Sequence, residues 1–244
     1  MKVLFIQQDH VSSFGYVGDA FASRGFDVET FGVVPAEHFA VPDIAVDFPD
    51  PLGFDAVVPL GAPWSVYDTA TIGRWIADEL GFLRDAHDGG VPVLGICFGG
   101  QALAAALGGA VELSSEPELG WTAVASDEPD LVGPGPWFQF HQDRWQLPPG
   151  ARELARTGVA SQAFVLGRSL GLQFHPELTP SILQGWLDSG DREYLLAHGV
   201  DPDELMVRTV AEADAARERA ALLVDRFLDR IATAVFEAAQ PARD

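Results

Sequence analysis

Short apolar runs alternate with amphipathic stretches through the first part of the chain. The apolar run Val3–Ile6 predicts a buried first strand, and three further strands are expected at Phe26–Phe31, Phe54–Leu60 and Val91–Ile96. Between them, apolar residues at helical spacing with glycine close behind predict three helices: Phe14–Arg24, Ile72–His87 and Gly99–Leu107. Strands that alternate with helices in this way are typical of a parallel sheet covered on both faces.

The pattern changes after Leu107. Short β-like stretches between Gly- and Pro-rich turns predict a small antiparallel extension that returns to the main sheet: Trp121–Ser126, Phe164–Leu166 and Leu170–Phe174. Asp203–Glu237 then has apolar positions at helical spacing, with Asp201-Pro202 as a good helix start.

The expected fold class is therefore α/β: a doubly wound, mostly parallel sheet with a small antiparallel extension and a C-terminal helix. We expect one domain over residues 1–190 and a helical extension over residues 191–244 that packs on the same domain. The tail from Gln240 to Asp244 is expected to fray.

Composition and charge exclude several kinds of binding partner and site. The chain has 244 residues and a formal net charge of −21, so it should repel nucleic-acid backbones and anionic membrane surfaces. A single cysteine excludes an internal disulfide, and no metal or organic cofactor is indicated. No apolar run has the length of a signal peptide core or a membrane span, so we expect a soluble, cytoplasmic protein.

The single cysteine lies in a glycine-rich segment between a predicted strand and a predicted helix, Gly95-Ile96-Cys97-Phe98-Gly99-Gly100-Gln101. This spacing predicts a nucleophile elbow, a turn so tight that small residues are needed two positions before and after the nucleophile. The helix N-terminus favours a reactive thiolate at Cys97, and the N–H of Phe98 can bind an oxyanion. Gln101, one helical turn later, can line the pocket.

A thiolate that attacks an amide needs a proton donor for the leaving group. The segment Gln173-Phe174-His175-Pro176-Glu177 ends an apolar run, and alternate residues of a strand point the same way. His175 and Glu177 can therefore act as base and orienter, following the logic of the serine triad. His141 is the competing base and otherwise a candidate pocket residue.

These two segments together resemble the class I (triad) glutamine amidotransferases, and among these the stand-alone members similar to the glutaminase domain of GMP synthase. The resemblance implies a flavodoxin-like fold and glutamine hydrolysis through a γ-glutamyl thioester. It implies Cys97 as nucleophile, His175 as base and Glu177 as orienter.

Two further segments resemble the family's oxyanion loop and its His-Gly-Asp segment: Gly61–Asp68, with Ala62 in place of a usual glycine, and His141–Asp143, with Gln142 in place of a glycine. Together with the elbow, they imply a set of oxyanion- and substrate-binding residues: Gly61, Ala62, Phe98, Gln101, Gln139, His141 and Asp143.

The phosphate loop Gly-x-x-x-x-Gly-Lys-Ser/Thr does not occur, so we do not expect this chain itself to use ATP. The leading hypothesis is a glutaminase-type hydrolase that hands ammonia to a separate synthetase or acceptor subunit. The alternative is a stand-alone γ-glutamyl peptidase or hydrolase, which needs no partner. An inactive binding module is disfavoured by the intact Cys97, His175 and Glu177, and an α/β-hydrolase by the acid following the histidine.

Overall fold

The computed structural model describes residues 1–233. Its main sheet has eight strands in the order β2-β1-β3-β4-β10-β9-β8-β6. Five strands pair in parallel: β1 (Lys2–Gln7), β2 (Asp27–Gly32), β3 (Ala56–Pro59), β4 (Val93–Ile96) and β10 (Ser169–Leu172). Three antiparallel strands extend it: β9 (Ser161–Leu166), β8 (Arg152–Arg156) and β6 (Ala125–Ser126). The predicted mostly parallel α/β sheet is thus confirmed.

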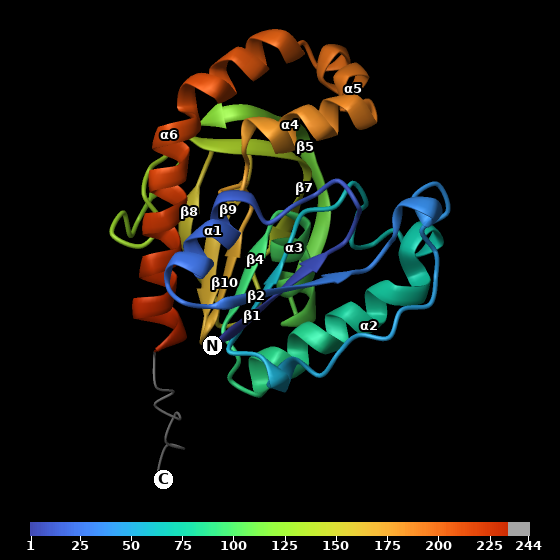
Figure 1. Cartoon of the computed structure of the whole chain (residues 1–244), viewed down its shortest axis with the longest axis vertical. Coiled ribbons are helices and arrows are strands. Elements are labelled where there is room, and N and C mark those ends of the chain that lie inside the picture. The colour runs from blue at the N-terminus through green and yellow to red at the C-terminus, as the bar shows by residue number, and fades with distance from the viewer. Residues whose placement is uncertain (234–244) are drawn as a thin grey trace.

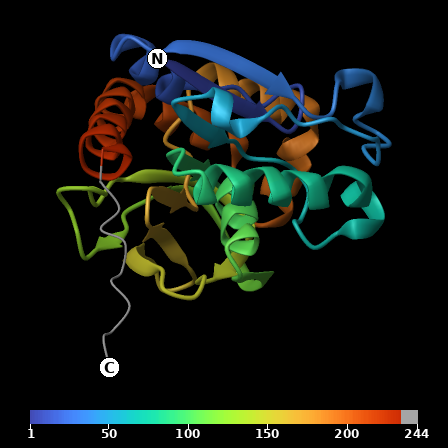
Figure 2. The ribbon, with the colours of Figure 1, turned by 90° about the horizontal axis from the view of Figure 1, so that it is seen from below.

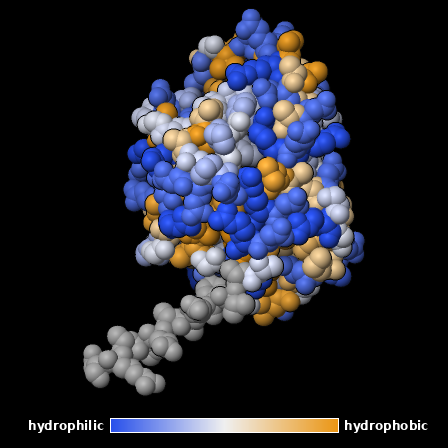
Figure 3. Space-filling model, turned by 90° about the vertical axis from the view of Figure 1, so that its left-hand side faces the viewer, coloured by the Kyte–Doolittle hydropathy of each residue, from blue (hydrophilic) through white to orange (hydrophobic). Residues whose placement is uncertain are grey.

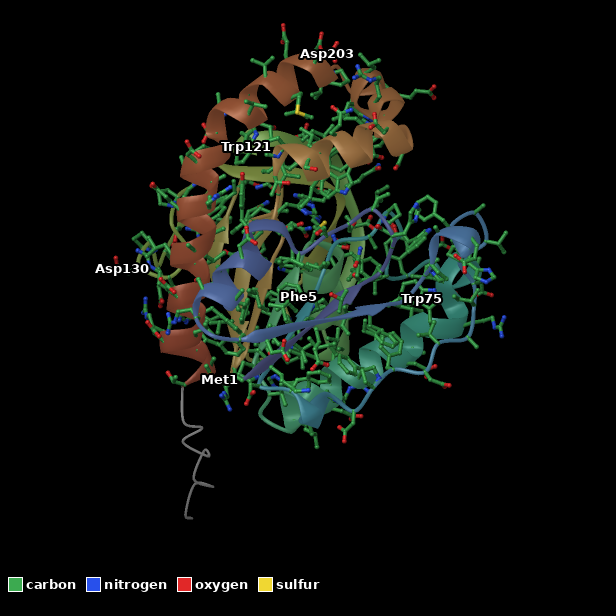
Figure 4. All side chains as sticks on the ribbon, viewed as in Figure 1. Met1, Phe5, Trp75, Trp121, Asp130 and Asp203 are labelled. Atoms are coloured by element: carbon green, nitrogen blue, oxygen red, sulfur yellow. The ribbon has the colours of Figure 1, made fainter. Side chains whose placement is uncertain are left out.

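Helices cover both faces of this sheet (Figures 1 and 2). On one face lie α1 (Gly15–Ser23) and α6 (Pro202–Phe227), and on the other α2 (Thr69–Asp88) and α3 (Phe98–Ala106). The alternation of β1 explains this arrangement, because Phe5 packs in the core under α1 whereas Ile6 packs in the core under α2. Figure 4 shows Phe5 in the interior and Trp75 on α2.

The last described helix packs along the sheet by its C-terminal half. Leu223, Val224 and Phe227 of α6 are buried in the core that contains α1. The outward side of this region is mostly hydrophilic (Figure 3). Helix α6 ends at Phe227 and continues as a π-helical turn, Leu228–Ala232, whereas the predicted helix ran to Glu237; its last residues, and the tail from Gln240, lie outside the described residues.

The domain boundary expected at residue 190 stays a prediction. Within residues 1–233, no helix combines the length and apolar composition that crossing a bilayer requires.

A small antiparallel part of the fold was predicted and is confirmed, but part of it forms a second, two-stranded sheet whose pairing was not predicted. It pairs β5 (Ala110–Thr122) with β7 (Trp137–Gln146). The predicted strand Trp121–Ser126 was wrong as one element, because β5 ends at Thr122 and Ala125–Ser126 pairs in the other sheet. The remaining short elements complete the chain: 3-10 turns Ala36–His38 and Pro51–Gly53, α4 (Pro180–Trp186), a π-helical turn Leu187–Asp191, and α5 (Arg192–Ala197).

A buried polar pair joins the end of β1 to α2. Gln8 and Glu79 are both 0% exposed, and Nε2 of Gln8 donates to Oε1 of Glu79 at 2.7 Å. Oε1 of Gln8 and Oε2 of Glu79 have no hydrogen-bond partner. A proton on Oε2 of Glu79 can be donated to Oε1 of Gln8 and satisfies both atoms. Burial raises the pKa of Glu79 to about 7, against the lowering effect of the Gln8 hydrogen bond.

This pair predicts a pH dependence of stability. The folded state holds the Glu79 proton up to a pKa of about 7, whereas the ordinary value is 4.5. Its contribution is therefore complete below pH 4.5 and is lost as the pH rises to 7, on the order of 3 kcal/mol in the free energy of unfolding. Urea unfolding from pH 4 to 8 measures it. Glu79→Gln, whose carboxamide makes the same two bonds without a proton, should lose this slope; an unchanged slope contradicts the assignment.

Candidate active site

A sharp bend at the carboxyl end of β4 presents Cys97. Its backbone has φ 50° and ψ −110°, and among the described residues it is the only non-glycine with positive φ. The glycines of the bend are required by space, because a Cβ atom at Gly95 would lie 2.6 Å from the carbonyl oxygen of Gly99. Hydrogen bonds fix the bend, from Cys97 N–H to Leu172 (2.8 Å) and from Gly99 N–H to Leu60 (2.9 Å). A strained nucleophile position of this kind is typical of an elbow.

His175 and Glu177 follow β10, which ends earlier than predicted, at Leu172. The chain beyond the strand is still held, since the N–H of His175 donates to the Phe138 carbonyl at 2.8 Å. Nδ1 of His175 lies 2.7 Å from Oε1 of Glu177, and both side chains are 3% exposed. Nε2 of His175 is buried without a hydrogen-bond partner. The acid thus fixes the ring by one nitrogen and leaves the other free.

The pKa of His175 stands well above its ordinary value. Burial lowers it, but the negative charges of Glu177 and Cys97 and the hydrogen bond to Glu177 raise it more. The imidazole is therefore set up to hold a proton beside the cysteine.

Cys97 and His175 line one pocket of about 290 Å³. Six of the residues predicted to bind the oxyanion or the substrate line it as well: Gly61, Ala62, Phe98, Gln101, His141 and Asp143. Gly61 lies against both reactive side chains, because a methyl group at this position would lie 3.0 Å from Cε1 of His175 and 3.8 Å from Cβ of Cys97. Phe98 opens α3, where N–H groups lack acceptors within the helix.

Gly61→Ala should therefore lower kcat/KM about 10- to 100-fold, because the added methyl displaces the imidazole or the substrate by a fraction of an ångström. Steady-state kinetics measures the loss. Gly81→Ala is the matched control, since a methyl group there would meet nothing within 4 Å on α2. Full activity of Gly61→Ala contradicts this placement of Gly61.

Gln139 does not line the pocket, unlike the other predicted binding residues. It is 0% exposed, and its Oε1 lies 3.1 Å from Nε2 of His141, while its Nε2 donates to Gln162. Gln139 thus orients His141 through a side-chain contact and does not itself line the pocket. Both ring nitrogens of His141 face oxygen atoms, the second being the Asp143 carbonyl at 3.1 Å, which leaves His175 as the histidine with a free nitrogen at the cysteine.

The structure adds residues that the sequence pattern did not single out. Gln173 donates to Sγ of Cys97 at 3.8 Å and accepts from Gln101 at 3.3 Å. Trp186 stacks edge-on against His175, with ring centroids 5.1 Å apart. The hydroxyl of Tyr67 donates to Asp143 at 2.9 Å. Gln173 and Tyr67 had a local signal, because they belong to the recognised segments Gln173–Glu177 and Gly61–Asp68, whereas Trp186 had none.

This site can be compared with known proteins. A family model described as glutamine amidotransferase class-I matches residues 19–185, more than half of the 244-residue chain. The chain belongs to the class-I glutamine amidotransferase family. This finding confirms the family that the motifs around Cys97 and His175 indicated.

Relatives of this class-I glutamine amidotransferase include GMP synthases named as glutamine-hydrolyzing. The protein from Thiobacillus denitrificans is 35% identical over 160 residues, which are 59% of this chain and 29% of that protein. The protein from Thermomicrobium roseum is 39% identical over 127 residues, 48% of this chain and 22% of that protein. The chain thus spans less than a third of the length of these curated relatives.

Solved structures share the fold. A glutamine amidotransferase from Thermotoga maritima superposes with a TM-score of 0.79 at 23% identity, covering 94% of this chain and 98% of that one. A glutamine amido transferase from Methylobacillus flagellatus has the same TM-score at 24% identity, covering 93% and 94%. Because the identities are 23% and 24%, these comparisons show that the chain shares the fold of the two structures.

Proposed function

We propose that this class-I glutamine amidotransferase hydrolyses the side-chain amide of glutamine through a γ-glutamyl thioester on Cys97. The observation that carries this proposal is the free, buried Nε2 of His175 on the same pocket as Cys97, with Glu177 bound to the opposite ring nitrogen. Glutamine is also the compound named as hydrolysed by the GMP synthase relatives.

In the first step the Cys97 thiolate forms a bond to the amide carbon, and the carbonyl π electrons move to the oxygen. We assign the stabilisation of that oxyanion to the N–H of Phe98 and to the loop at Gly61 and Ala62, all of which line the pocket. When the oxyanion collapses, the carbon–nitrogen bond breaks and the nitrogen takes the proton from Nε2 of His175. Ammonia leaves and the thioester remains.

In the second step a water molecule attacks the thioester carbon and gives a proton to Nε2 of His175, which is now neutral. The carbon–sulfur bond breaks, glutamate leaves, and Cys97 returns as a thiolate beside a protonated imidazole. Glu177 stabilises the imidazolium at both ends of the cycle because it accepts from Nδ1.

A second candidate, hydrolysis of other γ-glutamyl amides, is favoured by the extent of the pocket. Besides Cys97 and His175, Trp186, Asp191 and Tyr194 line it, and its volume of about 290 Å³ leaves room for a leaving group larger than ammonia. Transfer of ammonia to a separate synthetase or acceptor subunit also stays a proposal, since the matched part of the GMP synthases is under a third of their length.

Release of glutamate and ammonia by the purified chain tests the function. Glutamine, a γ-glutamyl peptide and a γ-glutamyl alkylamide are assayed side by side with asparagine as the control for chain length. We expect turnover of γ-linked amides and none of asparagine. Absence of turnover with every γ-linked amide, for a folded chain, contradicts the proposal.

A further inference from the structure

The imidazole of His175 defines the end of the pocket where the leaving group lies, because it donates the proton to the departing nitrogen. Two segments flank that end. The loop between β1 and α1 carries Asp9, and the start of α1 is tied to this region by a hydrogen bond from Tyr16 N–H to the Glu177 carbonyl at 3.1 Å. Trp186 packs on His175, and the π-helical turn that follows it carries Asp191.

This end of the pocket is negatively charged. Three carboxylates line the pocket, Asp9, Asp143 and Asp191, and none of the lining residues is lysine or arginine. Asp143 accepts from Tyr67, and Asp9 accepts from the N–H groups of Val11 and Ser12 and from the hydroxyl of Ser12. Asp191 caps no helix N–H and lies close enough to Asp9 to feel its charge. Burial and the charge of Asp9 raise the pKa of Asp191 to about 6, so it is ionised at pH 8.

Two further observations point to a ligand rather than to an acidic surface. Nε2 of His175 is buried without a hydrogen-bond partner, and His175 lines the same pocket as Asp9 and Asp191. Aromatic rings wall the same end, with Phe140 5.5 Å from Trp186 and 6.0 Å from Tyr194 between centroids. Aromatic rings beside carboxylates bind alkylammonium groups well. Among the described residues these carboxylates do not converge as metal ligands do.

We infer that, on the proposed function, the leaving-group end of the pocket selects γ-glutamyl amides of amines that carry a second positive charge, with Asp191 and Asp9 as the recognition residues. Diamines and polyamines are the chemical class that meets this condition. Amides whose leaving amine carries a carboxylate, as in γ-glutamyl peptides, are disfavoured, because a like charge would enter a pocket without a basic side chain.

Three γ-glutamyl amides of similar size test this inference at pH 8: those of 1,4-diaminobutane, of pentylamine and of 4-aminobutanoate. We expect kcat/KM to fall in that order, by about tenfold from the cation to the neutral amide and further to the anion. Glutamine is assayed in parallel. Its hydrolysis tests the proposed function by itself, so that a failure of that function is distinguished from a failure of the charge preference.

Asp191→Asn should reduce the ratio of kcat/KM for the diaminobutane amide to that for the pentylamine amide by about tenfold. Asp188→Asn is the matched control: it makes the same charge change three residues away on an exposed position outside the pocket. We expect its ratio to equal that of the wild type.

Equal kcat/KM for the cationic and neutral amides overturns the inference. An unchanged ratio of the two kcat/KM values in Asp191→Asn overturns it too. A decrease of this ratio in Asp188→Asn equal to that in Asp191→Asn also overturns it, because the effect would then come from the overall charge of the protein. Calorimetric titration of the three amides into Cys97→Ser gives the order of affinities without turnover. A preserved charge order there, without hydrolysis by the wild type, would support the binding site and reject the proposed reaction.

Discussion

Replacing Cys97 with serine should lower kcat/KM for glutamine by at least about 10³-fold, because a neutral alcohol is a far poorer nucleophile than a thiolate. The backbone at Cys97, with φ 50°, must be kept by the variant for the comparison to hold. Thermal unfolding checks this, and we expect the free energy of unfolding to change by less than about 1 kcal/mol.

A folded Cys97→Ser variant with wild-type turnover would contradict the assigned chemistry. The chain contains one cysteine, so no second thiol can take over the reaction. Any activity of the Cys97→Ser variant beyond the expected residual turnover therefore comes from mistranslated or contaminating enzyme and not from another thiol of this chain.

Replacing Glu177 should produce the second large effect. Glu177→Ala leaves Nδ1 of His175 without its acceptor, and we expect kcat to fall about 10³-fold. Glu177→Gln keeps an oxygen for Nδ1 but removes the negative charge, and a smaller loss of about 10²-fold is expected. Steady-state kinetics with glutamine distinguishes the two contributions, orientation and charge.

The pH profile of kcat/KM distinguishes an electrostatic role of Glu177 from a purely structural one, because only an electrostatic role changes the pKa of His175. Because the charge of Glu177 raises the pKa of His175, Glu177→Gln should shift the limb of the kcat/KM profile that reports this histidine to lower pH. Glu193→Gln, which changes an exposed carboxylate on α5 outside the pocket, is the control and should leave the profile in place. Identical profiles in all three proteins would reject the coupling.

The sequence predicted the parts of the fold that repeat a simple pattern. Apolar runs such as Val3–Ile6 alternate with helical stretches, and each became a strand or helix within a few residues of its expected bounds. The bend at Cys97 was predictable for a local reason, since glycine is the residue that its spacing requires at Gly95.

The two-stranded sheet of β5 and β7 was not predictable in the same way. Its buried face on β7 carries polar side chains, among them Gln139, His141 and Asp143, so the apolar alternation that marks a strand is absent. These side chains are satisfied by partners distant in sequence, such as Gln162 for Gln139. Only the folded chain shows that pairing.

The residues at the proposed leaving-group end of the pocket had no local sequence pattern either. Trp186 and Asp191 belong to a helix and a π-helical turn that come after the last recognised motif; both line the pocket, and Trp186 packs on His175. Residues placed by tertiary packing alone lack a local pattern. Gln139 shows the converse, because it was predicted to bind the substrate next to the recognised segment His141–Asp143 and yet does not line the pocket.

We propose that Cys97 is a nucleophile that His175 activates, in a pocket that binds a γ-glutamyl group. Intact-mass spectrometry after exposure to a chloroketone analogue of glutamine tests it most directly. We predict one adduct per chain, on the peptide with Cys97, blocked by excess glutamine and slowed about 10²-fold in His175→Asn. Absence of an adduct, or labelling that glutamine does not block and His175→Asn does not slow, would contradict the account.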